Sequence, residues 1–319
     1  MRRILIRTAT CILMLLAVSA AVFFALRCAV SDPILTMVSP EVLSANADNI
    51  DALRDRLGLN DPLPVQYFRW LSAALRGDFG YSLTGARVAD ILFPRIYYTF
   101  QLTAAALVLS AVIGITAGCY AAFRRGGVFD AVSSAAASVL LALPQFFCGI
   151  VLVYIFSVKL SVLPASNRVS PGGGGIADII IHMILPVAAL TLSLSAVVVR
   201  YTRAAVLDNL SSDFVRNARA RGIPERQILI SHALRAGARP VVNLLILRLP
   251  MLVSGAVVIE SVFSYPGIGL AMTNAVSSGD YPVVTASALI ISFVMLLSSY
   301  AADAVSAMLD PRLGSGVSA

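Results

Sequence analysis

Residues 211–239 read SSDFVRNARARGIPERQILISHALRAGAR, a basic segment that lies between two long apolar runs. Polar residues at its start favour a helix N-cap, and the pattern predicts a short helix from Phe214 to Arg221. Gly222 then supplies the left-handed backbone position that ends many helices. Pro224 favours the first turn of a second helix. The segment therefore predicts a helix, a glycine turn and a second helix.

The composition around this segment is that of a membrane protein. The chain has 319 residues, of which 58% are hydrophobic and only 13% are charged, whereas soluble domains carry about 25% charge. A helix needs roughly 20 apolar residues to cross a bilayer, and helices satisfy their own backbone hydrogen bonds in lipid. We therefore expect an all-α membrane protein with about six transmembrane helices, at residues 9–30, 98–122, 131–158, 179–199, 240–262 and 283–308.

The first apolar run has two interpretations. Arg2, Arg3 and Arg7 precede it, and residues 17–20 form a weak cleavage-like site, as in a signal peptide. The run continues to about Val30, however, which is longer than the usual apolar region of a signal peptide. A retained membrane anchor is therefore the favoured interpretation.

Arginine placement predicts the orientation. Basic residues gather before the first run, after the second, and between the fourth and fifth. The positive-inside rule places such segments in the cytoplasm. We expect both termini and the 200–239 loop to be cytoplasmic and residues 31–97 to face outward. The same placement accounts for the formal net charge of +7, so nucleic-acid binding is not expected.

These expectations divide the chain into parts. They are an N-terminal tip with the first transmembrane helix at 1–30, an outward helical segment at 31–97, a five-helix core at 98–310 and a cytoplasmic tail at 311–319. Within the outward segment, helices are expected from about Ser39 to Leu57 and from Gln66 to Leu75. This segment is either a small cap packed on the bundle, which we favour, or part of a docking face for an external partner.

The helix from Phe214 also has two interpretations. Its arginines and the small residues Ala218 and Ala220 suit docking to another protein surface. A basic amphipathic helix can instead lie on anionic lipid. Composition alone leaves the two open.

The segment resembles the cytoplasmic loop of inner-membrane permeases of binding-protein-dependent ABC importers. That signature is Glu-Ala-Ala, three residues and Gly; here Ala218 and Gly222 match, while Arg216 and Asn217 replace the glutamate and the first alanine. The form RNARARG at 216–222 is similar to the peptide and nickel branch of the family. Further elements of that branch appear in order, as GDFGYS at 77–82, LPQF at 143–146, LPAS at 163–166, HALR at 232–235, ESVF at 260–263, YPGIG at 265–269, DYPVV at 280–284 and DPR at 310–312.

The resemblance implies a type I ABC importer permease fold in a bacterial inner membrane, and a mechanism. Such a permease pairs with a second, similar permease and with two cytoplasmic ATPases, and an external binding protein delivers the substrate. The loop helix sits in a groove on one ATPase, so this subunit is a transport subunit and binds no cofactor, while ATP and Mg²⁺ are bound by the partner ATPases. The implied docking residues are Phe214, Arg216, Asn217, Ala218, Arg219, Ala220, Arg221, Gly222, Ile223, Pro224 and Glu225.

Two charged residues at membrane depth are candidates for the translocation pathway. Arg248 lies inside the fifth run and Glu260 near its outer end, and such charges normally face the bundle interior. Arg248 would meet a substrate carboxylate or pair with an acid on the partner permease. The in-span prolines Pro144, Pro186 and Pro250 are expected to kink their helices.

No catalytic or metal site is expected. The four cysteines form no CxxC pair, and His182 and His232 would face opposite sides of the membrane. The leading function is import of short peptides. Import of nickel, a metallophore or glutathione by the same mechanism is the alternative. A stand-alone secondary transporter would need an inverted repeat or acids near the midplane, and a membrane enzyme would need a catalytic motif that the sequence lacks.

Overall fold

The apolar runs become long helices. The computed structural model describes residues 2–29, 60–224, 227–228 and 235–309. Four helices in this part are long and apolar enough to cross a membrane, and two bent helix pairs raise the number to as many as six. The four are α1 (Arg2–Ala29), α6 (Val88–Phe123), α9 (Ile176–Leu210) and α15 (Tyr281–Leu309). The expected all-α membrane fold with about six spans is confirmed, and the helix expected at Ser39–Leu57 lies outside the described residues.

Two of the expected spans are broken. The third divides into α7 (Val128–Ala142), α8 (Gln145–Leu152) and the π-helix η1 (Val153–Lys159), with a bend of 106° after α7. The fifth divides into α12 (Arg235–Leu247) and α13 (Leu249–Val262), with a bend of 43°. The kinks expected at Pro144 and Pro250 are therefore confirmed, but an apolar run does not show how large each bend is.

Prolines explain where the breaks fall. Pro144 is the N-cap of α8, and the preceding Leu143 has an extended backbone (φ −86°, ψ 135°), as expected for a residue before proline. Pro250 lies in the first turn of α13, where its missing N–H is not needed. Pro186 behaves differently, because α9 continues through it as one helix of 35 residues.

The chain divides into two compact units, Met1–Thr99 with Pro266–Leu296, and Phe100–Tyr265 with Leu297–Ala319. The first unit holds α1, the helix α5 (Leu63–Ala74), the helix α14 (Ile268–Ser278) and the early parts of α6 and α15. Its core is apolar and includes Phe79, Val88, Leu92, Ile268, Ala271, Val283 and Ile290. The helix α6 begins at Val88 rather than near residue 98, because the residues between are part of this core.

The helix expected at 66–75 is confirmed as α5, and its aromatic side chains pack on α1. Tyr67 is buried, and its ring lies 5.6 Å from that of Phe23 and 6.3 Å from that of Trp70. Its hydroxyl is 2.8 Å from the hydroxyl of Ser19. In contrast, Phe68 is exposed. The packing of α5 on α1 in the first unit agrees with the interpretation of a small cap.

A buried carboxylate ties the loop before α6 to the start of α15, in the same unit. Asp280 accepts a hydrogen bond from the Ser82 hydroxyl, and its Oδ2 also accepts the N–H of Leu83 at 3.2 Å. Its Oδ1 accepts the N–H of Val283 at 3.4 Å, within the first turn of α15. The two sequence motifs GDFGYS and DYPVV are therefore hydrogen-bonded to each other.

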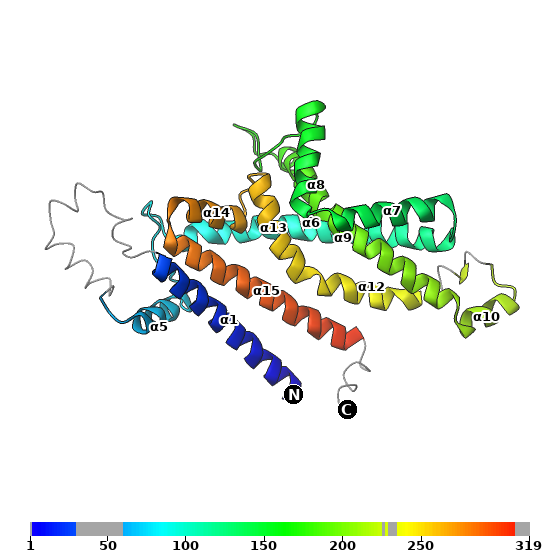
Figure 1. Ribbon diagram of the computed structural model, residues 1–319, viewed down its shortest axis with the longest axis horizontal. Coiled ribbons are helices and arrows are strands. Elements are labelled where there is room, and N and C mark those ends of the chain that lie inside the picture. The colour runs from blue at the N-terminus through cyan, green and yellow to red at the C-terminus, as the bar shows by residue number, and fades with distance from the viewer. Residues whose placement is uncertain (1, 30–59, 225–226, 229–234, 310–319) are drawn as a thin grey trace. The chain divides into compact units, whose positions relative to one another are not determined.

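The second unit is built around α9 (Figure 1). Its close contact with α6 depends on Gly118, where an added Cβ would lie 2.7 Å from the Val199 carbonyl oxygen and from the Cβ of Thr202. One turn earlier, Gly114 fits against Val198 in the same way. Small residues at this spacing let helix backbones approach closely in membranes.

Candidate functional site

The basic segment begins at the end of α9. This helix ends at Leu210, and only two residues separate it from the helix α10 (Asp213–Ala220) (Figure 1). Within the turn, the N–H of Ser212 donates to Asn209 O at 3.2 Å, and the N–H of Val215 donates to Ser212 O at 3.1 Å. Backbone hydrogen bonds hold both residues of this short turn, so α10 is attached directly to the end of a long helix.

The glycine turn has the expected geometry. Gly222 has φ +76°, and its N–H donates to Arg219 O at 2.9 Å. The N–H of Ile223 donates to Ala218 O at 3.3 Å, which is the long bond of a Schellman cap. A new turn then begins at Pro224, whose carbonyl accepts the N–H of Ile228 at 3.0 Å. The predicted first helix and the glycine turn are confirmed, while most of the predicted second helix, with Glu225 and His232, lies outside the described residues.

The described apolar side of α10 is covered by the chain itself. Val215 and Ile228 are fully buried and Ala218 nearly so, and the three form a cluster against which Leu210 and Ile223 pack. Ala218 therefore packs inside the chain, and Ala220 lies on the exposed side. A helix that rests on lipid buries its apolar face in the membrane, whereas here the described part of that face is covered by the chain itself.

The opposite side of α10 is polar and basic. The Arg216 side chain is 74% exposed, and its Nη2 lies 3.4 Å from Asp213 Oδ1. Phe214 lies in α10, but its side chain is outside the described part. The other exposed positions of the expected site are Asn217, Arg219, Ala220, Arg221, Gly222 and Pro224. The exposed members of the predicted site therefore form one short surface that carries three arginines.

The last turns of α9, which carry α10, are held by three other helices. Thr202 lies against Gly118 of α6, and Ala205 lies against Gly237 at the start of α12. Between these contacts, Arg203 reaches α7 and forms an ion pair with Asp130. The C-terminal turns of α9 therefore contact three helices of the second unit, namely α6, α7 and α12.

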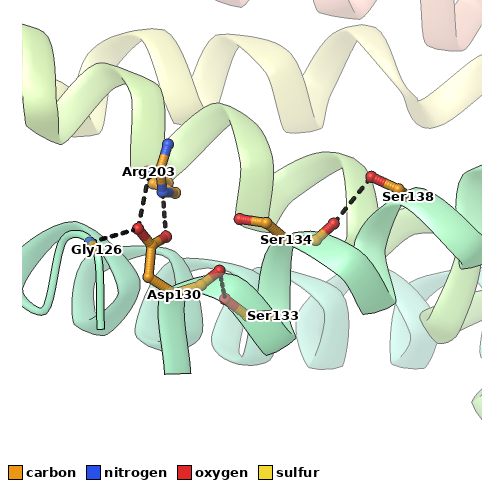
Figure 2. Close-up of polar contacts among 6 residues, drawn as sticks. All are labelled: Gly126, Asp130, Ser133, Ser134, Ser138 and Arg203. Carbon is orange, nitrogen blue, oxygen red and sulfur yellow. Dashed lines mark hydrogen bonds and ion pairs between the residues drawn. The ribbon is translucent and has the colours of Figure 1, made fainter. Parts of the chain in front are cut away.

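The ion pair is bidentate (Figure 2). Arg203 Nε donates to Asp130 Oδ1, and Arg203 Nη2 donates to Asp130 Oδ2 at 2.8 Å. The N–H of Gly126, in the turn before α7, also donates to Oδ2 at 3.0 Å. This geometry is the strong form of a charge-assisted hydrogen bond, and it joins α7 to α9 over 73 positions of sequence.

The two charged residues expected in the pathway lie at opposite ends of α13. Arg248 is the N-cap residue at the break between α12 and α13, and its Nη1 lies 3.2 Å from Met251 Sδ. Glu260 is fully buried near the other end. At 1.5 Å per residue the two backbones are roughly 18 Å apart, so the structure does not bring these two residues together.

Comparison with known proteins gives a consistent result over almost the whole chain. Residues 114–315 match the family described as the binding-protein-dependent transport system inner membrane component, and residues 1–103 match the family of its N-terminal part. The chain belongs to this family of transport-system inner-membrane components. It is a permease subunit of an ABC importer, and its role is transport rather than catalysis.

Named relatives of this permease cover it nearly end to end. A Brucella suis biovar 1 protein, named as a peptide permease, is 37% identical over 303 residues, which are 94% of this chain and 95% of that protein. The probable peptide ABC transporter permease of Sinorhizobium fredii is 33% identical over 97% of this chain and 98% of its own length. The glutathione transport system permease GsiC of Escherichia coli K12 is 35% identical over 94% of each chain.

A solved structure supports the fold. The permease superposes on a chain of the inward-facing methionine ABC transporter MetNI with a TM-score of 0.55 and 16% identity, over 69% of this chain and 96% of that one. At this identity the likeness concerns the fold alone, and it agrees with the type I permease fold expected from the sequence.

The permease also contains functional candidates that sequence reasoning missed. Arg203 is one of the basic residues between the fourth and fifth runs, which indicate only the orientation, and the sequence predicts no role for Asp130. The sequence contains two signals, namely an acid three residues after the Gly126–Gly127 turn and an arginine that continues the helical register of the fourth span beyond its apolar part. Neither residue could be paired with the other from the sequence, because 73 positions separate them and the chain between forms other helices.

Proposed function

We propose that this permease forms half of a pathway for short peptides and that α10 with the Gly222 turn docks a cytoplasmic ATPase. The observation that best supports docking is that Val215 and Ala218 are buried against Ile228 of the same chain. This burial leaves a polar, arginine-bearing face exposed on a helix fixed to α9. A rigid helix at the end of a bundle can transmit a rigid-body motion to the helices that hold it.

The proposed assembly contains this permease, a second permease, two ATPases and an external binding protein. ATP and Mg²⁺ bind to the ATPases, and this subunit binds no cofactor. The permease lies in the inner membrane with both termini in the cytoplasm, and residues 31–97 face outward. The family supports these partners, because its description names both a binding protein and an inner-membrane component.

Substitution at Gly222 tests docking. Gly222→Leu places a side chain on a backbone of φ +76°, which disfavours a residue with a Cβ. A Cβ at this position meets no atom within 4 Å, so the rest of the chain keeps its packing. We expect the Gly222→Leu complex to retain the second permease, lose bound ATPase and lose uptake. Gly222→Asn is the matched control, because asparagine tolerates this conformation. Normal uptake and normal ATPase binding by Gly222→Leu would refute the docking proposal.

The substrate class is tested by uptake into proteoliposomes. The peptide permease names among the relatives support short peptides, and the glutathione permease name supports glutathione as a second candidate. Labelled dipeptide, oligopeptide, glutathione and Ni²⁺ are offered separately with the complete importer. Uptake of dipeptide or oligopeptide supports the proposal, and uptake of glutathione or Ni²⁺ alone overturns it.

We also assign Arg248 and Glu260 to the pathway. Arg248 stands at the break of the fifth span, and interrupted helices place polar groups at the midplane of transporters. If Arg248 meets the peptide carboxylate, Arg248→Gln slows uptake of free peptides more than uptake of amidated ones. An equal loss for both kinds of peptide identifies Arg248 as a structural residue.

Orientation is tested by labelling single cysteines from outside the cell. Arg125 and Gly175 are suitable positions, since both are exposed and neither has a left-handed backbone. The proposed orientation predicts labelling at 175 and protection at 125. The opposite pattern would invert it.

A further inference from the structure

The third span has separate attachments on the two sides of its bend. On one side, α7 runs along α9 and is joined to it by the Asp130–Arg203 pair (Figures 1 and 2). On the other side, α8 packs on α13, where Gly149 lies against Phe263, and the Gln145 side chain fills the space beside Gly255. Because α8 also packs on α9, the two halves of the span share α9, and α8 has a second attachment, to α13.

The bend between the halves has the properties of a hinge. Leu143 and Pro144 both have extended backbones, and Pro144 has no N–H to donate. The last bond of α7 runs from Leu143 N–H to Val139 O, while the first bonds of α8 start from Pro144 O. Within the described residues, no backbone hydrogen bond crosses the Leu143–Pro144 bond. A rotation about this point therefore breaks no helical hydrogen bond, and hinges absorb motion at a few such residues.

We propose that the Asp130–Arg203 pair is a strut that makes α7 follow α9 when the ATPase moves α10. Arg203 lies seven residues, or about two helical turns, before the end of α9. A displacement of α10 passes through this end, and the bidentate pair fixes the position and the orientation of α7 against it. The motion is then taken up at Leu143–Pro144, because α8 is held by α13 as well as by α9. The two residues are positioning residues, because they act on the pathway through α7.

The inference rests on the proposed ATPase docking, and its test separates the two. The complete importer, with both permeases, both ATPases and the binding protein, is reconstituted in liposomes. Peptide uptake and ATP hydrolysis are measured in the same vesicles, and ATPase binding is measured on the purified complex. Loss of docking removes the ATPases, as expected for Gly222→Leu, whereas loss of the strut leaves them bound and reduces only the peptide moved per ATP.

The single variants are Asp130→Asn and Arg203→Gln. Each keeps the size of the side chain and removes one charge. We expect each to lower the peptide moved per ATP by about 2- to 30-fold, the range by which mutations along a coupled network change coupling. The matched control is Arg69→Gln, which breaks the exposed Asp61–Arg69 pair in the first unit and leaves the ratio unchanged. A wild-type ratio in both strut variants, with ATPases bound, overturns the strut whatever Gly222→Leu does.

The reversed pair, Asp130→Arg with Arg203→Asp, distinguishes loss of the charge link from a general loss of folding. It restores the charge link, and we expect a ratio closer to wild type than that of either single variant. A ratio as low as in the single variants, in an assembled complex, overturns the proposal even if the single variants fail to assemble.

Spin labels give a readout that a purely structural pair would not change. Labels at 138 and 201, both exposed, report α7 against α9, and labels at 139 and 158 report α7 against η1. They are placed in importers whose native cysteines are replaced by serine. On ATP trapping we expect the second distance to change and the first to stay constant, with the first becoming variable in Asp130→Asn. A constant second distance in the wild type, or a changing first distance, overturns the strut.

Discussion

Two buried aspartates hold distant parts of the chain together in different ways. Asp280 and Asp130 have nearly the same exposure, 6% and 5%. Asp280 accepts hydrogen bonds from the hydroxyl of Ser82 and from two backbone N–H groups. Asp130 accepts one backbone N–H and the guanidinium of Arg203. Equal burial therefore does not imply an equal role.

The donors account for the difference. The backbone N–H groups at Asp280 cannot move without moving the loop or the first turn of α15, and the N-terminus of that helix favours a negative charge. The Arg203 guanidinium stands on a long side chain that can follow a shift of its partner. Asp280 is therefore an anchor that fixes one arrangement, whereas Asp130 joins two helices that can still move together.

The largest effect is expected at the anchor. Asp280→Ala leaves the Ser82 hydroxyl and the N–H groups of Leu83 and Val283 without their acceptor in a buried place. We expect the free energy of unfolding to fall by about 3 kcal/mol, since each buried donor left unpaired costs about 1–3 kcal/mol and a lost helix cap costs about 1 kcal/mol. The measurement is reversible unfolding in mixed dodecyl maltoside and SDS micelles.

Asp280→Asn is the control for this change. It keeps one carbonyl oxygen as an acceptor and removes the charge, so we expect a loss of about half that of the alanine variant. If Asp280→Ala unfolds at the same SDS fraction as the wild type, the bonds at Asp280 do not hold the loop, and the distinction between anchor and link fails.

Sequence patterns predicted what is local in this fold. The length of apolar runs gave the spans, and the left-handed preference of glycine gave the turn at Gly222, because both depend on neighbouring residues. The Asp280–Ser82 contact joins positions 198 residues apart. The two motifs that carry these residues were recognised separately, and nothing in their spacing pairs them.

The bent spans show a second limit. Pro144 indicated a kink, but an angle of 106° depends on α8 packing against α13, where Gly149 and Gly255 allow the approach. Pro186 shows the converse, since this buried proline lies inside α9 and the helix continues through it. The exposed side of α10 was likewise predictable in composition, while the burial of Ala218 depends on Ile228 folding back beneath it.

A smaller effect is expected at the link. Asp130→Ala removes the partner of Arg203, but the Arg203 side chain is 30% exposed and can turn toward water or lipid headgroups. We expect a loss of about 2 kcal/mol, below the 3–5 kcal/mol of a fully buried pair, because solvent screens the remaining charge. A double-mutant cycle with Arg203→Ala in the same micelles isolates the pair.

The control at the link is Ser133→Ala. The Ser133 hydroxyl donates to the backbone oxygen of Asp130 at 3.2 Å, so this variant changes the same turn of α7 without changing the charge pair. We expect a change within about 0.5 kcal/mol. A cycle energy near zero for Asp130 with Arg203 would show that the pair contributes no stability, and would leave its proposed role to the uptake measurements alone.

The smallest effect is expected at a third aspartate, although its contact is close. Arg69 Nη2 lies 2.7 Å from Asp61 Oδ2, but the two side chains are 58% and 38% exposed. Water and salt screen such a pair, and we expect Arg69→Gln to change the free energy of unfolding by less than about 0.5 kcal/mol. Raising the salt concentration should remove even this difference, while leaving the loss at Asp280→Ala nearly unchanged. A loss at Arg69→Gln as large as that at Asp130→Ala would mean that distance, rather than burial and the mobility of the donor, determines how strongly an aspartate holds this chain.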